Sequence, residues 1–315
     1  MKPYMMSLVL LTAIALPVAA QEPQCQNANP QAQAACNTMV DATKAFHPLA
    51  GMIVSGGNPV LGSAGTLGGF GHVSVTIRVN AIKASLPNPD SAAQNPVPSS
   101  FDGYLPAPVV EAAIGLYGGH GGGLLSIDGL ASAVLLPASR VPGMSVDPDA
   151  PKIGDVALGL GYGVRIGLLR GGFPVPAVSV SVMKRHLPRV QFGNVNAPTS
   201  DPADFATDFD AVNWRATAGM RVLFADVAAG VGIDHYTSAA TIHYFDGLTT
   251  HTVTLDLANT REVLFANAGL TMGLVKFVAE LGFQTGTDQS FATTFSDFDP
   301  KAGHVFWGAG LRINF

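Results

Sequence analysis

The chain ends in the segment HVFWGAGLRINF, residues 304–315, in which one set of alternate positions is wholly apolar. These positions hold Val305, Trp307, Ala309, Leu311, Ile313 and Phe315. The positions between them hold His304, Phe306, Gly308, Gly310, Arg312 and Asn314. Because successive side chains of a β-strand point to opposite faces, the segment predicts a strand with one apolar face and one face of mostly small or polar residues.

The same alternation recurs along the chain and indicates about ten strands. It is clearest in residues 73–80, 156–167, 177–182, 213–222 and 277–284. Weaker versions lie near residues 108–118, 124–136, 226–236 and 262–273. Runs of this length with a period of two are typical of sheets rather than of helices.

Long and short connections alternate between these runs. The long connections lie near residues 85–107, 137–152, 188–208, 237–261 and 287–302, and the short ones near 119–123, 169–173, 224–226 and 273–275. This order is typical of an up-and-down antiparallel barrel with long outer loops and short periplasmic turns. Residues 241–254 also alternate, so an extra hairpin there, giving twelve strands, is the alternative.

The composition narrows the environment. Of the 315 residues, 48% are hydrophobic and only 12% are charged, with a net charge of −5. A disordered chain is richer in charge, and a nucleic-acid-binding protein carries a basic surface, so both classes are excluded. A soluble β-sandwich would carry many charged residues on its outer face. Here the second face holds Gly, Ala, Ser, Thr and isolated ions, which favours the interior of a narrow barrel.

The N-terminus predicts export. Residues 1–20 contain Lys2, an apolar core and small residues before Gln21, the pattern of a signal peptide. No later stretch is apolar for the length that a membrane helix requires. We therefore expect residues 68–315 to form a closed transmembrane β-barrel in the outer membrane, with the lipid bilayer around it.

The final strand resembles the C-terminal signature of bacterial outer-membrane β-barrel proteins. The resemblance rests on Trp307, Leu311, Ile313 and the terminal aromatic Phe315. It implies that the barrel-insertion machinery binds this strand. A shorter segment, Ser55-Gly56-Gly57-Asn58-Pro59, is similar to the plug region of outer-membrane fatty-acid and hydrocarbon transporters, although those barrels are larger.

Residues 21–67 lack strand alternation and form a separate segment. We expect a short helix over residues 32–46 that breaks before Pro48. The segment lies either in the periplasm or in the lumen as a plug. In an oxidising compartment, Cys25 and Cys36 predict a disulfide, with two free thiols as the alternative.

The polar parity of the strands places charged side chains in the lumen. These candidates are Arg78, Glu111, Asp155, Arg165, Arg215, Arg221, Asp234, Glu280 and Arg312, with Asp128 as a further acid. Buried ions need partners, so the charges either pair to fill the barrel or line a wet path. The sequence therefore predicts a small channel or transporter for a minor solute, an apolar one included. The alternative is a non-transporting structural or surface-recognition barrel acting through its outer loops.

No spacing in the sequence marks a catalytic site, a metal site or a cofactor site. Asp234 and His235 are adjacent in a strand and face opposite sides, whereas Asp208, Asp210 and His251 lie in or beside loops. The sequence therefore predicts that the chain is not an enzyme, uses no cofactor and binds no nucleic acid.

Overall fold

The computed structural model describes most of the chain. It covers residues 22–26, 29–87, 91, 94, 96–121, 124–136, 144–172, 174–193, 203–286 and 289–315. The predicted signal peptide, residues 1–20, lies outside the described residues. No helix among the residues described is long and apolar enough to span a membrane.

The described chain consists of two helices near the N-terminus followed by strands. The helices are a 3-10 turn η1 (Pro23–Cys25) and α1 (Pro30–Ser55). The strands are β1 (Val73–Pro87), β2 (Ser99–Tyr117), β3 (Ser126–Leu136), β4 (Met144–Val146), β5 (Lys152–Ile153), β6 (Val156–Leu169), β7 (Ala177–Phe192), β8 (Ala203–Val222), β9 (Ala225–Phe245), β10 (Thr250–Met272), β11 (Val275–Gln284) and β12 (His304–Asn314).

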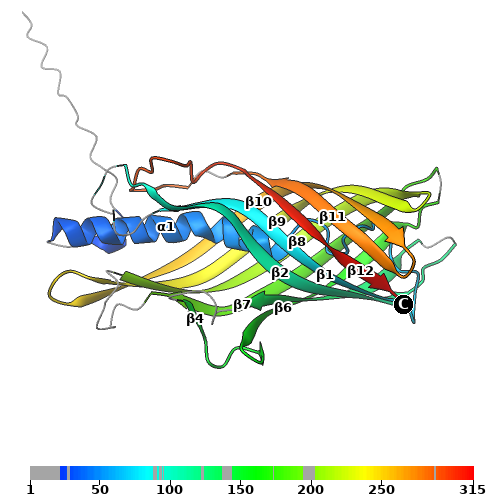
Figure 1. Ribbon diagram of the computed structural model, residues 1–315, viewed down its shortest axis with the longest axis horizontal. Coiled ribbons are helices and arrows are strands. Elements are labelled where there is room, and N and C mark those ends of the chain that lie inside the picture. Colours follow the sequence, from blue (N-terminus) through cyan, green and yellow to red (C-terminus); the bar gives the residue numbers. More distant parts are fainter. Residues whose placement is uncertain are drawn as a thin grey trace, which may run out of the picture.

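Ten antiparallel strands close into a barrel, as predicted (Figure 1). Strand β1 pairs with both β2 and β12, and β6 pairs with β7, so no strand of the ring has a free edge. The short strands β4 and β5 lie outside the ring, on the edges of β7 and β6. The twelve-strand alternative, which placed an extra hairpin in 237–261, is wrong because the alternating residues there are the outer ends of β9 and β10, joined by the turn at 246–249.

Strands β8, β9 and β10 are much longer than their neighbours. β9 has 21 residues and β10 has 23, whereas β11 has 10 and β12 has 11. The outer ends of these strands read as a loop in sequence because their outward residues are polar. Their inward residues, among them Ile242, Tyr244 and Val253, are buried against the N-terminal helix. We call the part of β8–β10 formed by residues 203–210, 236–245 and 250–259 the outer wall.

The exterior of the barrel is apolar. Large hydrophobic side chains are exposed on the outward parity, including Ile77, Tyr162, Trp214, Ile233, Leu264, Leu281 and Leu311. The inward parity holds Ser, Thr, Gly and buried ions. A soluble protein would leave this apolar area in water, whereas a bilayer covers it. The expected outer-membrane location is therefore confirmed.

The two ends of the barrel differ. At one end, Val73 and Phe315 exchange two backbone hydrogen bonds, of 3.1 and 2.8 Å, beside the tight turns that follow Val222 and Met272. The opposite end carries the outer wall and the connection between β11 and β12. In an outer-membrane barrel the end with short turns faces the periplasm, so the outer wall faces the cell exterior.

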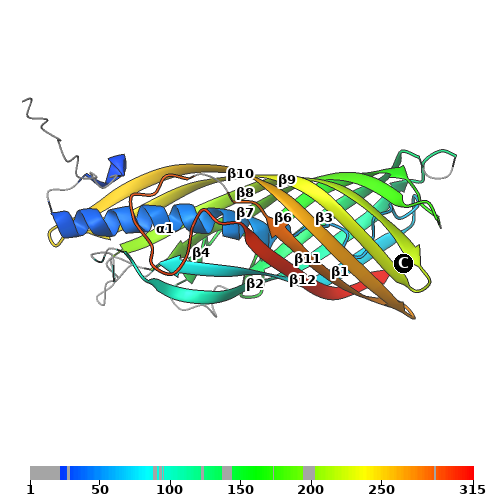
Figure 2. The same ribbon diagram turned by 90° about the horizontal axis from the view of Figure 1, so that it is seen from above.

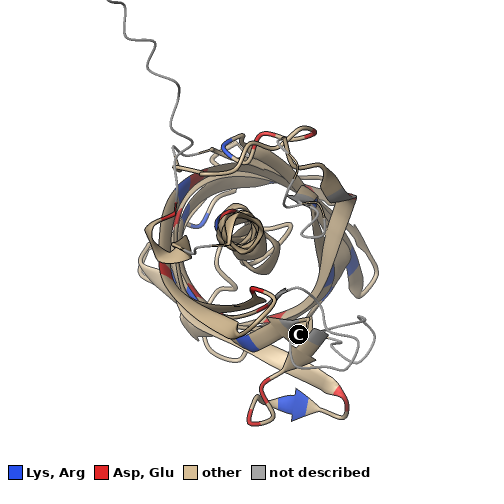
Figure 3. Cartoon of the chain, turned by 90° about the vertical axis from the view of Figure 1, so that its left-hand side faces the viewer, with Lys and Arg blue, Asp and Glu red and all other residues tan. Residues whose placement is uncertain are grey.

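Helix α1 lies inside the ring of strands (Figures 2 and 3). It begins at the exterior end, where Asn29 accepts a hydrogen bond from the Gln31 N–H, and ends at Gly56, whose φ is +59°. The expected break at Pro48 is wrong. The helix continues to Ser55 because Leu49, Met52 and Ile53 pack against the inner wall, and this burial offsets the hydrogen bond that proline cannot make.

The orientation of β10 gives a first prediction. Replacing the outward Leu264 with Arg puts a charge in the apolar band and should lower the free energy of unfolding by about 2–4 kcal/mol. The matched control is Thr254→Arg, which lies on the same face of β10 but in the outer wall, and should change it by less than about 1 kcal/mol. Urea unfolding in lipid vesicles measures both. Equal effects at the two positions would contradict the assigned membrane band.

Candidate functional site in the barrel lumen

Two charged side chains in the centre of the lumen, Glu280 and Arg215, bind the peptide groups that follow α1. We call this cluster the latch. The Glu280 carboxylate accepts hydrogen bonds from the Gly57 N–H at 2.8 Å and from the Asn58 N–H at 2.6 Å. The Arg215 guanidinium donates from Nε to the Gly57 carbonyl at 2.7 Å and from Nη2 to the Gly56 carbonyl at 2.8 Å. The cation therefore also lies at the negative end of the helix dipole.

The two glycines of this latch allow the close approach. A Cβ atom at Gly57 would lie 2.6 Å from Glu280 Oε2 and 2.7 Å from the Phe265 ring. At Gly56 the positive φ and the nearby Arg78 guanidinium disfavour any side chain. Gly56 and Gly57 belong to the stretch that is similar in sequence to a plug region. Because they lack side chains, their backbone lies between buried charged groups.

The charges of the latch pair with further charges on the wall. Arg78 lies 2.8 Å from Glu111 and 3.5 Å from Glu280, and Arg215 lies 2.5 Å from Asp234. All of these side chains are buried. Because isolated ions are costly to remove from water, each charge depends on its partner and on the peptide groups of the central segment.

The segment between the latch and β1 is fixed at further levels. We call residues 29–72 the lumen segment. Lys276 donates to the Gly62 carbonyl at 2.5 Å, and Arg312 donates to the Leu61 carbonyl at 3.3 Å. Near the periplasmic end, the Leu67 N–H donates to the carboxylate of Asp128, which also pairs with Arg165 at 2.6 Å. Lumen charges from several strands therefore hold one extended stretch of backbone.

Two of the predicted lumen residues lie at or beyond the ends of their strands. Asp155 has the inward parity but sits in the exposed turn between β5 and β6. Arg221 is the next-to-last residue of β8, where its side chain is 68% exposed and pairs with Asp226 at 3.2 Å. Arg221 lines the hollow at the periplasmic mouth. Parity gives the face of a strand, whereas the strand's end decides whether that face is still enclosed.

Sequence reasoning missed other inward cations. Arg185 on β7 is buried, bonds to Asn213 and lies 3.7 Å from Glu111, and Lys276 on β11 lies 2.6 Å from Asp226. Extending the alternation of β7 beyond Val182 would have found Arg185.

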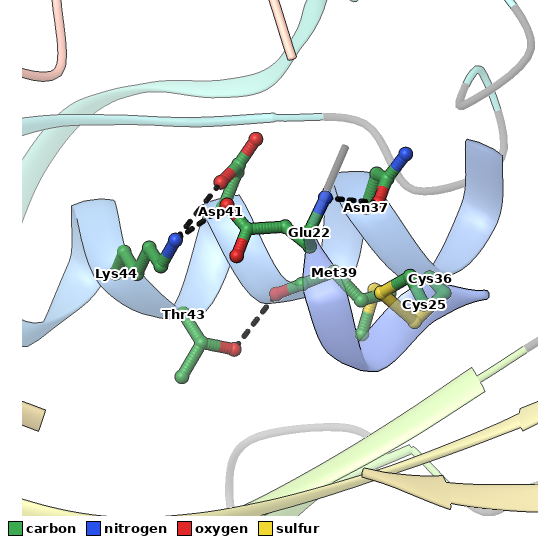
Figure 4. Close-up of a disulfide and its surroundings, with 8 residues drawn as sticks. All are labelled: Glu22, Cys25, Cys36, Asn37, Met39, Asp41, Thr43 and Lys44. Carbon is green, nitrogen blue, oxygen red and sulfur yellow. Dashed lines mark hydrogen bonds and ion pairs between the residues drawn. A yellow bond between two sulfur atoms is a disulfide. The ribbon is translucent and has the colours of Figure 1, made fainter. Parts of the chain in front are cut away.

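The exterior end of the lumen segment is anchored separately (Figure 4). Cys25 and Cys36 form a disulfide that packs with Val40 against Ile242 and Tyr244 of the outer wall. Two polar contacts join α1 to the β11–β12 connection, and a third joins it to Glu22. Lys44 bonds to Glu22 at 2.5 Å, Lys44 bonds to the Ser290 carbonyl at 3.3 Å, and the Thr293 N–H donates to Asp41 at 2.6 Å.

Three hollows lie on the outward face of the barrel or at its periplasmic mouth. Two of them, of about 730 and 640 Å³, lie on the outward face of β8–β11 among Ala216, Ala218, Ala266 and Leu281. A third, of about 450 Å³, lies at the periplasmic mouth and is lined by Thr66, Arg170, Arg221 and Asp226 among others. Within the described residues, no group of His, Cys, Asp and Glu is arranged to hold a metal ion.

The residues considered for catalysis are spread over both faces. Asp234 is buried with Arg215, whereas His235 points outward and contacts Thr260 at 3.1 Å. Asp210 pairs with His186 at 3.1 Å on the outside of the wall, a partner that sequence reasoning missed. His251 bonds instead to Asp246 at 2.6 Å.

Comparisons with known proteins find similar structures only at low sequence identity. No protein-family model and no curated protein sequence matches the chain. It is similar to the outer membrane protease OmpT of Escherichia coli, with 12% identity over 78% of this chain and 97% of that one and a TM-score of 0.42. It is similar to the translocator domain of the autotransporter NalP of Neisseria meningitidis, with 11% identity, 87% and 98% coverage and a TM-score of 0.43. The chain is also similar to the attachment invasion locus protein Ail of Yersinia pestis, with 11% identity over 78% of this chain and 99% of that one and a TM-score of 0.31.

The resemblance to bacterial outer-membrane β-barrel proteins is thus confirmed for the fold, with no subfamily assigned. Identities this low transfer no activity. One prediction needs correction: the sequence analysis excluded an enzyme, and that exclusion does not stand, since the similar structures include the outer membrane protease OmpT. The comparison removes the exclusion and assigns no catalytic residue to this chain.

The latch gives a second prediction. Glu280→Gln removes the charge that accepts both peptide N–H groups and pairs with Arg78, and should lower the free energy of unfolding by about 3–5 kcal/mol. Glu262→Gln is the matched control, because Glu262 is exposed on β10 and should change stability by less than about 0.5 kcal/mol. Denaturant titration in vesicles measures both, and an unchanged Glu280→Gln variant would show that the latch contributes nothing.

The exterior anchor gives a third prediction. Burial raises the pKa of the Asp41 carboxyl from 3.8 to about 7, although the Thr293 N–H bond and Lys44 act in the opposite direction. A group whose pKa is raised by folding stabilises the folded state below its unfolded pKa, and that stabilisation is lost as the pH rises through the folded value. The free energy of unfolding should therefore fall from pH 4 to pH 8.

Denaturant titration in vesicles at the two pH values measures this loss of stability. Asp41→Asn keeps an acceptor oxygen and should remove most of the pH dependence. A pH dependence that is the same in both proteins would assign it to another group.

Proposed function

We propose that the protein is a closed outer-membrane barrel that acts at the cell surface through its outer wall and the β11–β12 connection. The observation that carries this proposal is the filling of the lumen, where every residue from Gly51 to Gly62 is buried. A barrel that conducts solute keeps a continuous hydrated path lined by polar side chains. Here the central charges bind peptide groups of the chain itself.

The β11–β12 connection is held in place by specific contacts, which supports a role in recognition. In the β11–β12 connection, Phe295 packs with Phe291 and Phe298, with ring centroids 6.1 and 4.8 Å apart. The same connection is tied to α1 through Thr293, and to the β1–β2 connection by hydrogen bonds from the Val97 and Ser99 N–H groups. Ordered aromatic and polar side chains at an exposed end are the composition that recognition surfaces favour.

Two further roles stay predictions. The C-terminal strand, with Trp307 and Phe315 outward, is proposed to bind the barrel-insertion machinery. The channel or transporter hypothesis requires the lumen segment to move, and the recording described next tests it.

Current recording across a planar lipid bilayer tests the closed state. The intact protein should insert without conductance steps, because the lumen segment occupies the centre of the barrel. A variant lacking residues 29–66 should show discrete steps, and the Arg215→Gln/Glu280→Gln double variant should show intermittent ones if the deletion does not fold. Steady conductance from the intact protein would support the channel instead.

Complementation tests the surface role. In a strain lacking the gene, a variant whose residues 286–302 are replaced by a short Gly-Ser loop should insert normally and fail to restore the phenotype. A variant with the exposed turn residues 148–150 replaced is the control. Full restoration by the loop variant would remove the support for recognition through this connection.

A further inference from the structure

The lumen segment has an unexpected direction. It starts at the exterior end, where the Asn29 side chain donates to the Asp246 carbonyl in the β9–β10 turn at 2.9 Å. It finishes at the periplasmic end, where the Gly115 N–H donates to the His72 carbonyl at 2.8 Å and β1 begins. Figures 1 and 2 show α1 entering from the end opposite to the C-terminus.

Packing contacts show the path of the lumen segment through the barrel. Met39 and Val40 pack on the outer wall, Met52 and Ile53 pack in the middle of the barrel, and Ala64 packs against Ala177 and Ala228 near the periplasmic turns. The segment thus spans the barrel from end to end in one direction.

From this direction we infer that the barrel carries its own N-terminal segment outward across the outer membrane and displays residues 22–26 at the cell surface. An exported chain reaches the outer membrane from the periplasmic side, and β1 begins on that side. Residues N-terminal to β1 therefore reach the exterior only by crossing the membrane, and the lumen is the polar route that the structure shows them to occupy. The substrate of this activity is an extended or helical polypeptide, the chain's own.

The barrel meets the physical requirements of this crossing. A helix with its side chains is about 10–12 Å across, and α1 lies within the ring of strands (Figure 3). The driving force is binding. Burial of residues 51–62 and the latch on Glu280 and Arg215 stabilise the crossed state, and the disulfide at Cys25 and Cys36 packs on the outer wall once it arrives.

The inference goes beyond the proposed function, because a closed barrel with a periplasmic N-terminus would meet that proposal equally well. It also implies that a short peptide placed before Glu22 travels outward with the segment. The experiment below therefore reads the location of residues and not conductance.

Cysteine labelling of intact cells tests the inference. In a Cys25→Ser/Cys36→Ser background, single cysteines replace Gln31, Leu248 and Phe70, all of which are exposed. Leu248 lies in the β9–β10 turn and reports the exterior. Phe70 lies at the periplasmic end of the lumen segment. A membrane-impermeant maleimide should label Gln31→Cys and Leu248→Cys in intact cells and Phe70→Cys only after lysis.

Labelling of Gln31→Cys only after lysis, with Leu248→Cys labelled on intact cells, would overturn the inference. If the background does not fold, Leu248→Cys reports this by its own loss of labelling. A second measurement keeps both native cysteines: a short epitope inserted between Gln21 and Glu22 should bind antibody on intact cells. Binding only in lysed cells would likewise overturn it.

Discussion

The structure depends on the pairing of buried ions with buried peptide groups. A narrow barrel whose inner face carries Arg and Glu needs partners for those charges, since water is scarce among packed side chains. Here the partners are the N–H and carbonyl groups of Gly56, Gly57 and Asn58, together with the opposite charges on the wall. Neither the barrel nor the central segment satisfies its own polar groups alone. Each supplies what the other lacks.

Most of the barrel could be predicted from the sequence, because alternation reports directly which face meets lipid. The ten strands, the short periplasmic turns and many of the inward charges follow from that pattern. The outer wall could not be predicted in the same way. Its outward side meets water and its inward side meets α1, so the apolar parity switches and the stretch reads as a loop.

The candidate site was predictable in its charges and not in its centre. Parity placed Arg215 and Glu280 in the lumen, yet nothing in the sequence showed that their partners include peptide groups after a helix. The helix itself was underestimated, since Pro48 breaks a helix exposed to water but is tolerated in a helix that is packed inside the barrel. Local rules failed where tertiary burial outweighs local preference.

The pairing of β1 with β12 has a consequence for how the molecule is made. Val73 and Phe315 are neighbours in space, although almost the whole barrel separates them in the chain. One edge of β1 therefore stays unpaired until the last residues of the chain, which form β12, have been synthesised. Contacts this distant in sequence form slowly, and an unpaired edge invites aggregation meanwhile. Because β1 pairs with β12, the chain thus needs a chaperone that covers the unpaired edge of β1 during export.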